Sequence, residues 1–330
     1  FDNGPFEDID PDSTVTVTAS GTTGTITLTA TSAIFSADDI GTAFYMEQKD
    51  SSGVKAWNAA QDAALNNVRR YEGNYYKCTT CPNLGGPSGT GSNPPVHTEG
   101  AVWDGGGTDD SGDDKYYSNG VEWTYLHSGY GWVKITAIGG GGTTATATVI
   151  LNNGRFQLPT SFTTTGTTRW AKSAFSPLRG WPTSVAFFRE RLVYARNREL
   201  FFSVVGAYDD FSRKDGPDIT KETAIKLQIA SDRLDLIRWI TPSSSLLVGT
   251  ARNELSVQEQ TTTQVFAADN VASMPQTEYG SRLLEPIRVG NAVLFVQRAG
   301  RKLREMIYDY ASDRYKADDL TVLSEHIVDA

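Results

Sequence analysis

The chain has 330 residues, of which 39% are hydrophobic and 11% aromatic, and it contains 31 Gly. This composition is too apolar for a wholly disordered chain, and the length allows two or more packed cores. No run of about 18 apolar residues occurs, so the sequence predicts no membrane-spanning helix. The chain opens at Phe1 without an initiator Met, and we therefore expect a processed or partial polypeptide.

Charge and composition change sharply along the chain. Residues 1–168 hold 8 Lys and Arg against 18 Asp and Glu, whereas residues 169–330 hold 22 against 21. Thr is also uneven, with 27 of its 37 copies in the first part. The change predicts a domain boundary near residue 169, and residues 169–330 would form the second domain. The acidic first part argues against sequence-specific DNA binding, which needs a basic face.

The first part has the pattern of antiparallel β structure. Thr, Val, Ile and Leu alternate through residues 14–18 and 25–30 on either side of Gly-containing turns, and residues 144–151 repeat the pattern. Period-two alternation of β-branched residues is typical of half-buried strands in hairpins. We therefore expect a Thr-rich antiparallel β domain built from residues 1–50 and 129–168.

Residues 51–128 form an insert of different character, in which aromatic side chains stand among Gly, Asn and Thr. This composition predicts a small, loop-rich β module. Exposed Trp and Tyr rings could stack on sugars, or the same rings could supply the core of a module too small to have another one. Both interpretations apply to five candidate carbohydrate-binding residues: Trp57, Tyr75, Tyr76, Trp103 and Trp123.

The insert resembles small modules of phage tail and tailspike proteins and, more distantly, the chitin-binding modules of bacterial chitinases. The resemblance rests on Trp57, the segment YYKC at 75–78, the segment PPVHTEG at 94–100, Trp103, and VEWTY at 121–125. It implies a carbohydrate-binding site on the aromatic residues of the module.

The second part contains a loose repeat. Residues 191–204, 245–257 and 292–307 each read as an apolar strand, a short polar turn and a second strand. Repeats of about 40–50 residues built from hairpins are typical of β-propeller blades, and complete propellers have about four to eight of them. We therefore predict an all-β chain. A partial β-propeller, completed by blades outside this chain or by degenerate units, would accompany the Thr-rich domain and its β insert.

An ordered set of motifs in the second part resembles the tail nozzle or hub proteins of short-tailed phages, also called tail tubular protein B. The set includes RGWP at 179–182, IRWITP at 237–242 and EYGS at 278–281, and it covers about residues 175–328. The resemblance implies a structural protein of the virion tail. It would form a homohexameric tube below the portal and adaptor proteins, with viral DNA passing through its lumen and tail fibres or tailspikes docked on it.

The cysteines and an acidic loop are candidate ligand sites of low specificity. Cys78 and Cys81 form a lone CxxC pair, for which free thiols are the favoured interpretation. A local disulfide, or a zinc site completed by His97 and Asp104, are the alternatives. The acidic loop at 104–114 lacks the spacing of an EF-hand, so we expect a solvated loop.

No catalytic pattern emerges, and we expect a protein that is not an enzyme and binds no cofactor or metal. His97, His127 and His326 belong to no recognisable nucleophile or metal motif. Glu122 and Asp104 could cleave a glycosidic bond only if the fold held them about 5 or 9 Å apart.

Five arginines in turns of the second part are candidates for contacts to other subunits or to DNA phosphates in a lumen. Intersubunit or interblade ion pairs are the favoured interpretation, because acidic residues are as numerous in the same part. The candidates are Arg196, Arg198, Arg298, Arg301 and Arg304. A carbohydrate-binding adhesin or tail accessory protein that recognises host surface glycans is the alternative to the tail-tube function.

Overall fold

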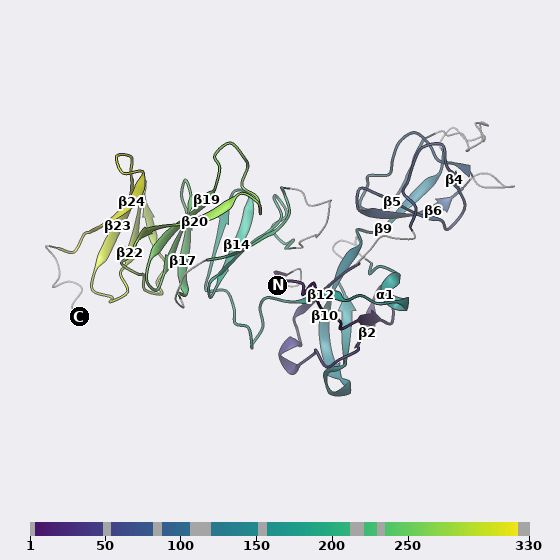
Figure 1. Ribbon diagram of the computed structural model, residues 1–330, viewed down its shortest axis with the longest axis horizontal. Helices are drawn as coiled ribbons and strands as arrows, with labels where there is room; N and C mark the ends of the chain where they lie inside the picture. The colour runs from purple at the N-terminus through teal and green to yellow at the C-terminus, as the bar shows by residue number, and fades with distance from the viewer. Residues whose placement is uncertain are drawn as a thin grey trace. The chain divides into compact units, whose positions relative to one another are not determined.

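Strands account for almost all the regular structure in the computed structural model, which describes residues 4–48, 54–81, 88–105, 120–150, 157–211, 221–229 and 235–322. The predicted all-β class is confirmed. The chain divides into two compact units, Phe1–Ala174 and Phe175–Ala330 (Figure 1). Strand β12, Arg169–Lys172, pairs with β3 of the first unit, so the boundary predicted near residue 169 lies a few residues too early.

The first unit is built around a six-stranded antiparallel sheet with the order β1-β2-β11-β10-β3-β12. Its strands are β1 (Val17–Ala19), β2 (Thr25–Ala30), β3 (Ala43–Glu47), β10 (Tyr130–Gly139), β11 (Thr144–Val149) and β12 (Arg169–Lys172). Three short helices lie between them, namely η1 (Ala37–Asp39), η2 (Gly140–Gly142) and α1 (Ser161–Thr164).

The Thr-rich alternation of this sheet places apolar side chains on the core face and hydroxyls in solvent. In β2 the side chains of Ile26, Leu28 and Ala30 are buried, while the three intervening Thr side chains are exposed. Strand β3 is buried along its whole length, because a second cluster that includes Tyr45 and Trp132 covers the opposite face. Sequence alternation therefore predicts β2 well and β3 poorly, since a strand buried on both faces does not alternate.

The insert leaves and rejoins the six-stranded sheet at one point. Glu47, at the end of β3, pairs directly with Tyr130, at the start of β10, so the module replaces what would otherwise be a hairpin turn. It contains a two-stranded sheet, β4-β7, and a four-stranded sheet with the order β5-β6-β9-β8. Its strands are β4 (Asp62–Ala63), β5 (Val68–Tyr71), β6 (Asn74–Thr80), β7 (Ser88–Gly89), β8 (Ala101–Trp103) and β9 (Glu122–His127).

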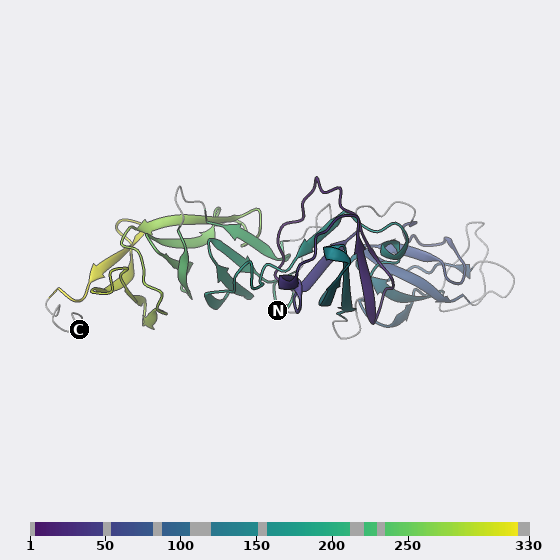
Figure 2. The ribbon, with the colours of Figure 1, turned by 90° about the horizontal axis from the view of Figure 1, so that it is seen from below.

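The second unit consists of three four-stranded antiparallel sheets, in each of which the strands lie side by side in chain order (Figures 1 and 2). We call them sheets A, B and C. Sheet A contains β13 (Ser184–Phe188), β14 (Arg191–Arg196), β15 (Glu199–Phe202) and β16 (Ile225–Gln228). Sheet B contains β17 (Ile237–Pro242), β18 (Leu246–Thr250), β19 (Glu254–Glu259) and β20 (Val271–Thr277). Sheet C contains β21 (Ile287–Val289), β22 (Ala292–Val296), β23 (Leu303–Asp309) and β24 (Arg314–Asp319). This meander order is that of β-propeller blades.

The three sheets pack face to face, with sheet B in the middle. One hydrophobic cluster joins sheets A and B, and includes Val193 and Phe202 from sheet A with Val248 and Val257 from sheet B. A second cluster joins Trp239 and Leu247 on the other face of sheet B to residues of sheet C such as Phe295 and Met306. The repeated hairpins predicted from the sequence are the two middle strands of each sheet, β14–β15, β18–β19 and β22–β23.

Candidate functional site

The insert packs its aromatic side chains around one buried carboxylate. Asp104 is 2% exposed and accepts hydrogen bonds from the indole Nε1 atoms of Trp123 at 2.7 Å and Trp57 at 3.3 Å. Its other oxygen accepts the backbone N–H of Val121 at 2.7 Å. Burial raises the pKa of Asp104, and these hydrogen bonds act in the opposite direction. The carboxylate thus fixes two indoles from distant parts of the module in one core.

Two tyrosines predicted for sugar binding are also buried. The Tyr75 ring lies against His127 with ring centroids 4.6 Å apart, and the Tyr76 hydroxyl donates to the His97 carbonyl at 3.0 Å. Burial lowers the pKa of His127 to about 4, so its imidazole is neutral at neutral pH.

Four of the five predicted carbohydrate-binding rings are therefore core residues. Trp57, Tyr75, Tyr76 and Trp123 are each at most 6% exposed. None of them offers a ring face to a sugar, and their assignment to an exposed platform is wrong. Trp103 is different, because it is 38% exposed on β8, an edge strand of the four-stranded sheet.

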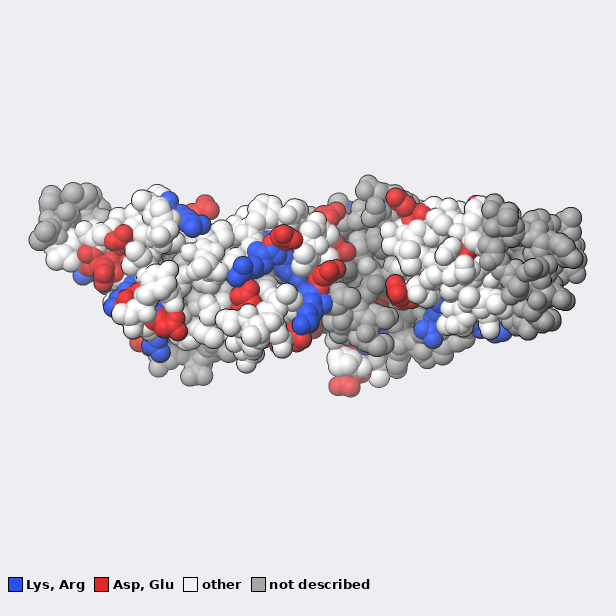
Figure 3. Space-filling view, turned by 90° about the horizontal axis from the view of Figure 1, so that it is seen from above, with Lys and Arg blue, Asp and Glu red and all other residues white. Residues whose placement is uncertain are grey.

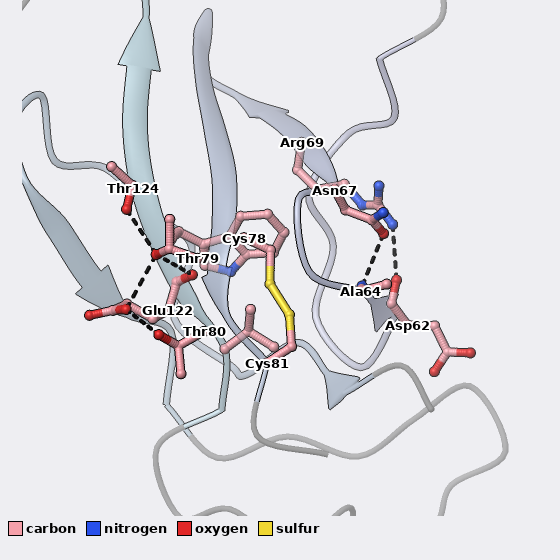
Figure 4. Close-up of a disulfide and its surroundings, with 12 residues drawn as sticks. Asp62, Ala64, Asn67, Arg69, Cys78, Thr79, Thr80, Cys81, Glu122 and Thr124 are labelled. Carbon is pink, nitrogen blue, oxygen red and sulfur yellow. Dashed lines mark hydrogen bonds between the residues drawn. A yellow bond between two sulfur atoms is a disulfide. The ribbon is translucent and has the colours of Figure 1, made fainter. Parts of the chain in front are cut away.

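Trp103 stands beside a network of hydroxyls on the outer face of that sheet. Its direct cross-strand partner is Glu122, whose carboxylate accepts hydrogen bonds from the hydroxyls of Thr80 at 2.5 Å and Thr79 at 3.2 Å. The Thr79 hydroxyl also meets that of Thr124 at 2.8 Å (Figure 4). The carboxylate is held in place next to an exposed indole.

Cys78 and Cys81 are joined by a disulfide, as Figure 4 shows. The favoured prediction of two free thiols is therefore wrong. The disulfide also removes the thiolates that the zinc alternative needs, and Asp104 is already bonded to two indoles. Among the described residues, no three His, Cys, Asp or Glu side chains gather closely enough to hold a metal ion.

Glu122 and Asp104 do not face one site. Glu122 and Trp123 are neighbours in β9, so their side chains point to opposite faces of the sheet, and Asp104 bonds the indole of Trp123. The sheet thus separates the two carboxylates that a glycosidase would need together. Residues 106–114 of the acidic loop and His326 lie outside the described residues.

Two of the five candidate arginines serve the interior of the second unit. Arg196 is 5% exposed, pairs with Glu199, and lies over the ring of Phe201 at 5.3 Å. Arg304 is 8% exposed, donates to the Ala317 carbonyl at 2.7 Å, and lies over a tyrosine ring. Both are unavailable to DNA or to a partner subunit, so the assignment to an interface or lumen is wrong for them.

The other three candidate arginines keep more contact with solvent. Arg298 and Arg301 are exposed in the turn between β22 and β23, and Arg198 is half-buried, with a bond to the Ile229 carbonyl at 3.3 Å. On the face seen in Figure 3, basic and acidic side chains of the described residues lie next to one another.

The outer faces of sheets A and C carry exposed apolar side chains that the sequence analysis did not single out. Val185 and Phe187, on β13, are 52% and 61% exposed. Ile287 and Val289, on β21, are 67% and 56% exposed. The sequence of β13 does indicate this exposed face, because Val185 to Phe188 is an unbroken apolar run, typical of a strand covered on both faces.

Comparison of the sequence with protein-family models and with curated proteins found no match. Among the residues that the structure describes, no helix is both long and apolar enough to cross a bilayer. The exposed outer faces of sheets A and C and the Trp103 face of the insert are thus the features on which a function can be argued.

Proposed function

We propose that this chain is a structural, non-enzymatic subunit of a phage tail, part of the nozzle or tube below the portal and adaptor proteins. One observation carries the proposal. Sheet B is covered on both faces, whereas the edge strands of sheets A and C, β13 and β21, expose apolar side chains on the faces turned away from sheet B. Exposed apolar patches of this kind mark surfaces that bind other proteins. The resemblance of the ordered motifs at 179–182, 237–242 and 278–281 to those of tail nozzle proteins supports the same role.

The outer faces fit β-sheets of neighbouring subunits or segments. Val185 and Phe187 alternate along β13 with Ala186 and Phe188, which pack toward sheet B, so they lie on the outer face of sheet A. Ile287 and Val289 pair with Leu294 and Ala292, on the face of sheet C that is turned away from sheet B. Full burial of one such side chain contributes about 1.5–3 kcal/mol, so a face of this size favours assembly. Repeated face-to-face packing of blades is how propellers exclude water from their cores.

A conduit for DNA also agrees with the distribution of charge. Tight phosphate binding needs many exposed, unopposed cations, and it would slow the release of DNA. Arg196 and Arg304 are used internally, and acidic groups accompany the basic side chains seen in Figure 3. Viral DNA would therefore pass without sequence-specific contacts.

The test is the assembly state of the full chain by native mass spectrometry. Phe187→Glu and Ile287→Glu should each shift the population from oligomers, which we expect to be hexamers, toward monomers. Leu65→Glu is the matched control, because Leu65 is 60% exposed but belongs to the insert and not to sheet A or C. A wild-type chain that stays monomeric at all concentrations would contradict the proposal.

A carbohydrate-binding adhesin or tail accessory protein is the second candidate, favoured by the Trp103 face. An exposed indole beside an organised carboxylate and Thr hydroxyls combines an apolar ring with hydrogen-bonding groups. A glycan array probed with the full chain tests it. Selective binding that Trp103→Ala abolishes would support the adhesin. An array without selective signal would reject the adhesin and leave the structural role as the remaining candidate.

A further inference from the structure

A cleft of about 570 Å³ lies in the second unit, lined by residues of both sheet B and sheet C. This volume is within the range of small-molecule sites, roughly 300–1,000 Å³. Its wall is unusual for a gap between packed sheets, because tyrosine, serine and amide side chains provide most of it. The residues that matter are Tyr308, Tyr310, Tyr315, Gln258, Arg288 and Asn291.

Three tyrosine rings form a fixed series at one side of the cleft. Tyr315 is buried, and its hydroxyl lies 2.9 Å from that of Ser244, in the turn between β17 and β18. Tyr308 meets Tyr315 edge-on at 5.3 Å, and Tyr310 meets Tyr308 edge-on at 4.9 Å. The Tyr308 hydroxyl donates to Asp313, which fixes the middle ring.

Tyr310, the last ring of the series, is 90% exposed. A tyrosine so exposed contributes little to the fold, since its apolar surface remains in water. Its contact with Tyr308 nevertheless orients it beside the cleft. The Tyr310 ring is thus available to a ligand in the cleft.

Other residues of the lining supply hydrogen-bonding groups. Arg288 is anchored by two carbonyls, with Nε donating to Gly290 at 3.2 Å and Nη1 donating to Pro242 of sheet B at 3.3 Å. Gln258, on β19, and Asn291, in the turn after β21, add side-chain amides, each of which has donor and acceptor atoms.

The cleft carries little net charge. Its lining holds one carboxylate, Glu259, which is ion-paired with Arg189 at 3.1 Å, and one cation, Arg288. An anionic ligand such as a phosphodiester would need an excess of cations. An apolar peptide segment would need a mainly apolar wall, whereas this one combines tyrosine rings and Ile307 with hydroxyl, amide and charged groups.

We propose that the cleft between sheets B and C is a binding site for a neutral saccharide. The Tyr310 ring packs against the C–H face of a sugar ring, and the amides of Gln258 and Asn291, with Arg288, bond its hydroxyls. An aromatic face with a few placed polar groups is the general composition of sites that hold amphipathic ligands. This site lies in the second unit and is independent of the Trp103 face.

Isothermal titration calorimetry of the full chain tests the assignment, with maltohexaose, cellohexaose and chitohexaose as neutral probes. We expect saturable binding of at least one of them. Tyr310→Ala should weaken it roughly two- to tenfold, the usual value of one aromatic contact, and Asn291→Ala should weaken it about fivefold. Both residues are exposed, so neither change should affect folding.

Leu65→Ala, at an exposed side chain of the insert, is the control and should leave the affinity unchanged. Titrations without heat for all three probes would overturn the proposal. So would an affinity that Tyr310→Ala and Asn291→Ala do not alter. Binding lost in Trp103→Ala alone would assign sugar recognition to the insert and remove it from the cleft.

Discussion

Mild acid should destabilise the insert through His127. This imidazole is 4% exposed, stacks on Tyr75, and accepts the backbone N–H of Gly129 through Nδ1 at 3.1 Å. Burial lowers its pKa from the ordinary value of 6.5 to about 4. Between these two values the unfolded chain binds a proton that the folded chain excludes, so the free energy of unfolding falls as the pH falls.

The size of the effect follows from the two pKa values. One pKa unit corresponds to about 1.36 kcal/mol, and half of the unfolded chains are already protonated at pH 6.5, so lowering the pH from 6.5 to 5 should remove about 1.6 kcal/mol of stability. The loss should be complete below about pH 3 and nearly absent above about pH 7. Asp104 and Glu254 have pKa values raised by burial, and their protonation in acid acts in the opposite direction.

A comparison of variants isolates the histidine. His127→Gln keeps an acceptor for Gly129 but cannot take up a proton, so its stability should lack this acid-induced loss. Urea unfolding of both chains, followed by tryptophan fluorescence at pH 7.5, 6.5, 5.5 and 5, gives the difference directly. Parallel pH profiles for wild type and His127→Gln would refute the reasoning, because every other titrating group is common to both.

Three further substitutions test the packing, each by thermal unfolding of the full chain. Asp104→Ala leaves two indole N–H groups unpaired and should cost about 3–5 kcal/mol, and a loss below about 1 kcal/mol would contradict its central role. Gly249→Ala would place a Cβ 2.0 Å from the Trp239 ring and should lower the free energy of unfolding by about 3 kcal/mol. Gly141→Ala, where a Cβ meets no neighbour, should lower it by about 1 kcal/mol, and equal losses in the two variants would refute the steric argument. Arg191→Met leaves four backbone carbonyls without their donor and should cost at least about 3 kcal/mol, so an unchanged stability would show that those bonds contribute nothing.

The sequence predicts the second unit better than the insert, for a physical reason. Hairpins that bury one face against a neighbour must repeat their apolar pattern, so the middle strands of sheets A, B and C can be recognised from residues 191–204, 245–257 and 292–307. The edge strands pair with one neighbour only, and their apolar pattern differs from sheet to sheet. The sequence pattern does not predict where they begin and end.

Composition does not predict which aromatic side chains of the insert are buried. Trp57 and Trp123 meet at Asp104 across separations of 47 and 19 residues along the chain, and no local pattern encodes that meeting. Aromatic residues in a small module are equally compatible with a platform and with a core. The difference lies in which face of a strand each occupies, and here only Trp103 of the five is exposed.

The exposure of Tyr310 and the burial of Arg196 were also not predictable from the sequence. Tyr310 looks unremarkable in the sequence, but the turn after β23 leaves it exposed at the edge of a cleft. Arg196 lies in a charged turn that suggests solvent or a partner, yet the cross-strand Glu199 and the ring of Phe201 hold it inside. Burial of long charged side chains depends on partners from neighbouring strands, and these are known only after folding.

Cryo-electron microscopy of the native particle that carries this chain would locate it directly. We expect six copies around the tail axis below the portal, with the exposed apolar side chains of β13 and β21 covered by neighbouring β-sheets. Copies found only at the periphery, away from the DNA channel and with those side chains open to solvent, would contradict the tail-tube role. Sugar recognition would then become the leading hypothesis for the function of the protein.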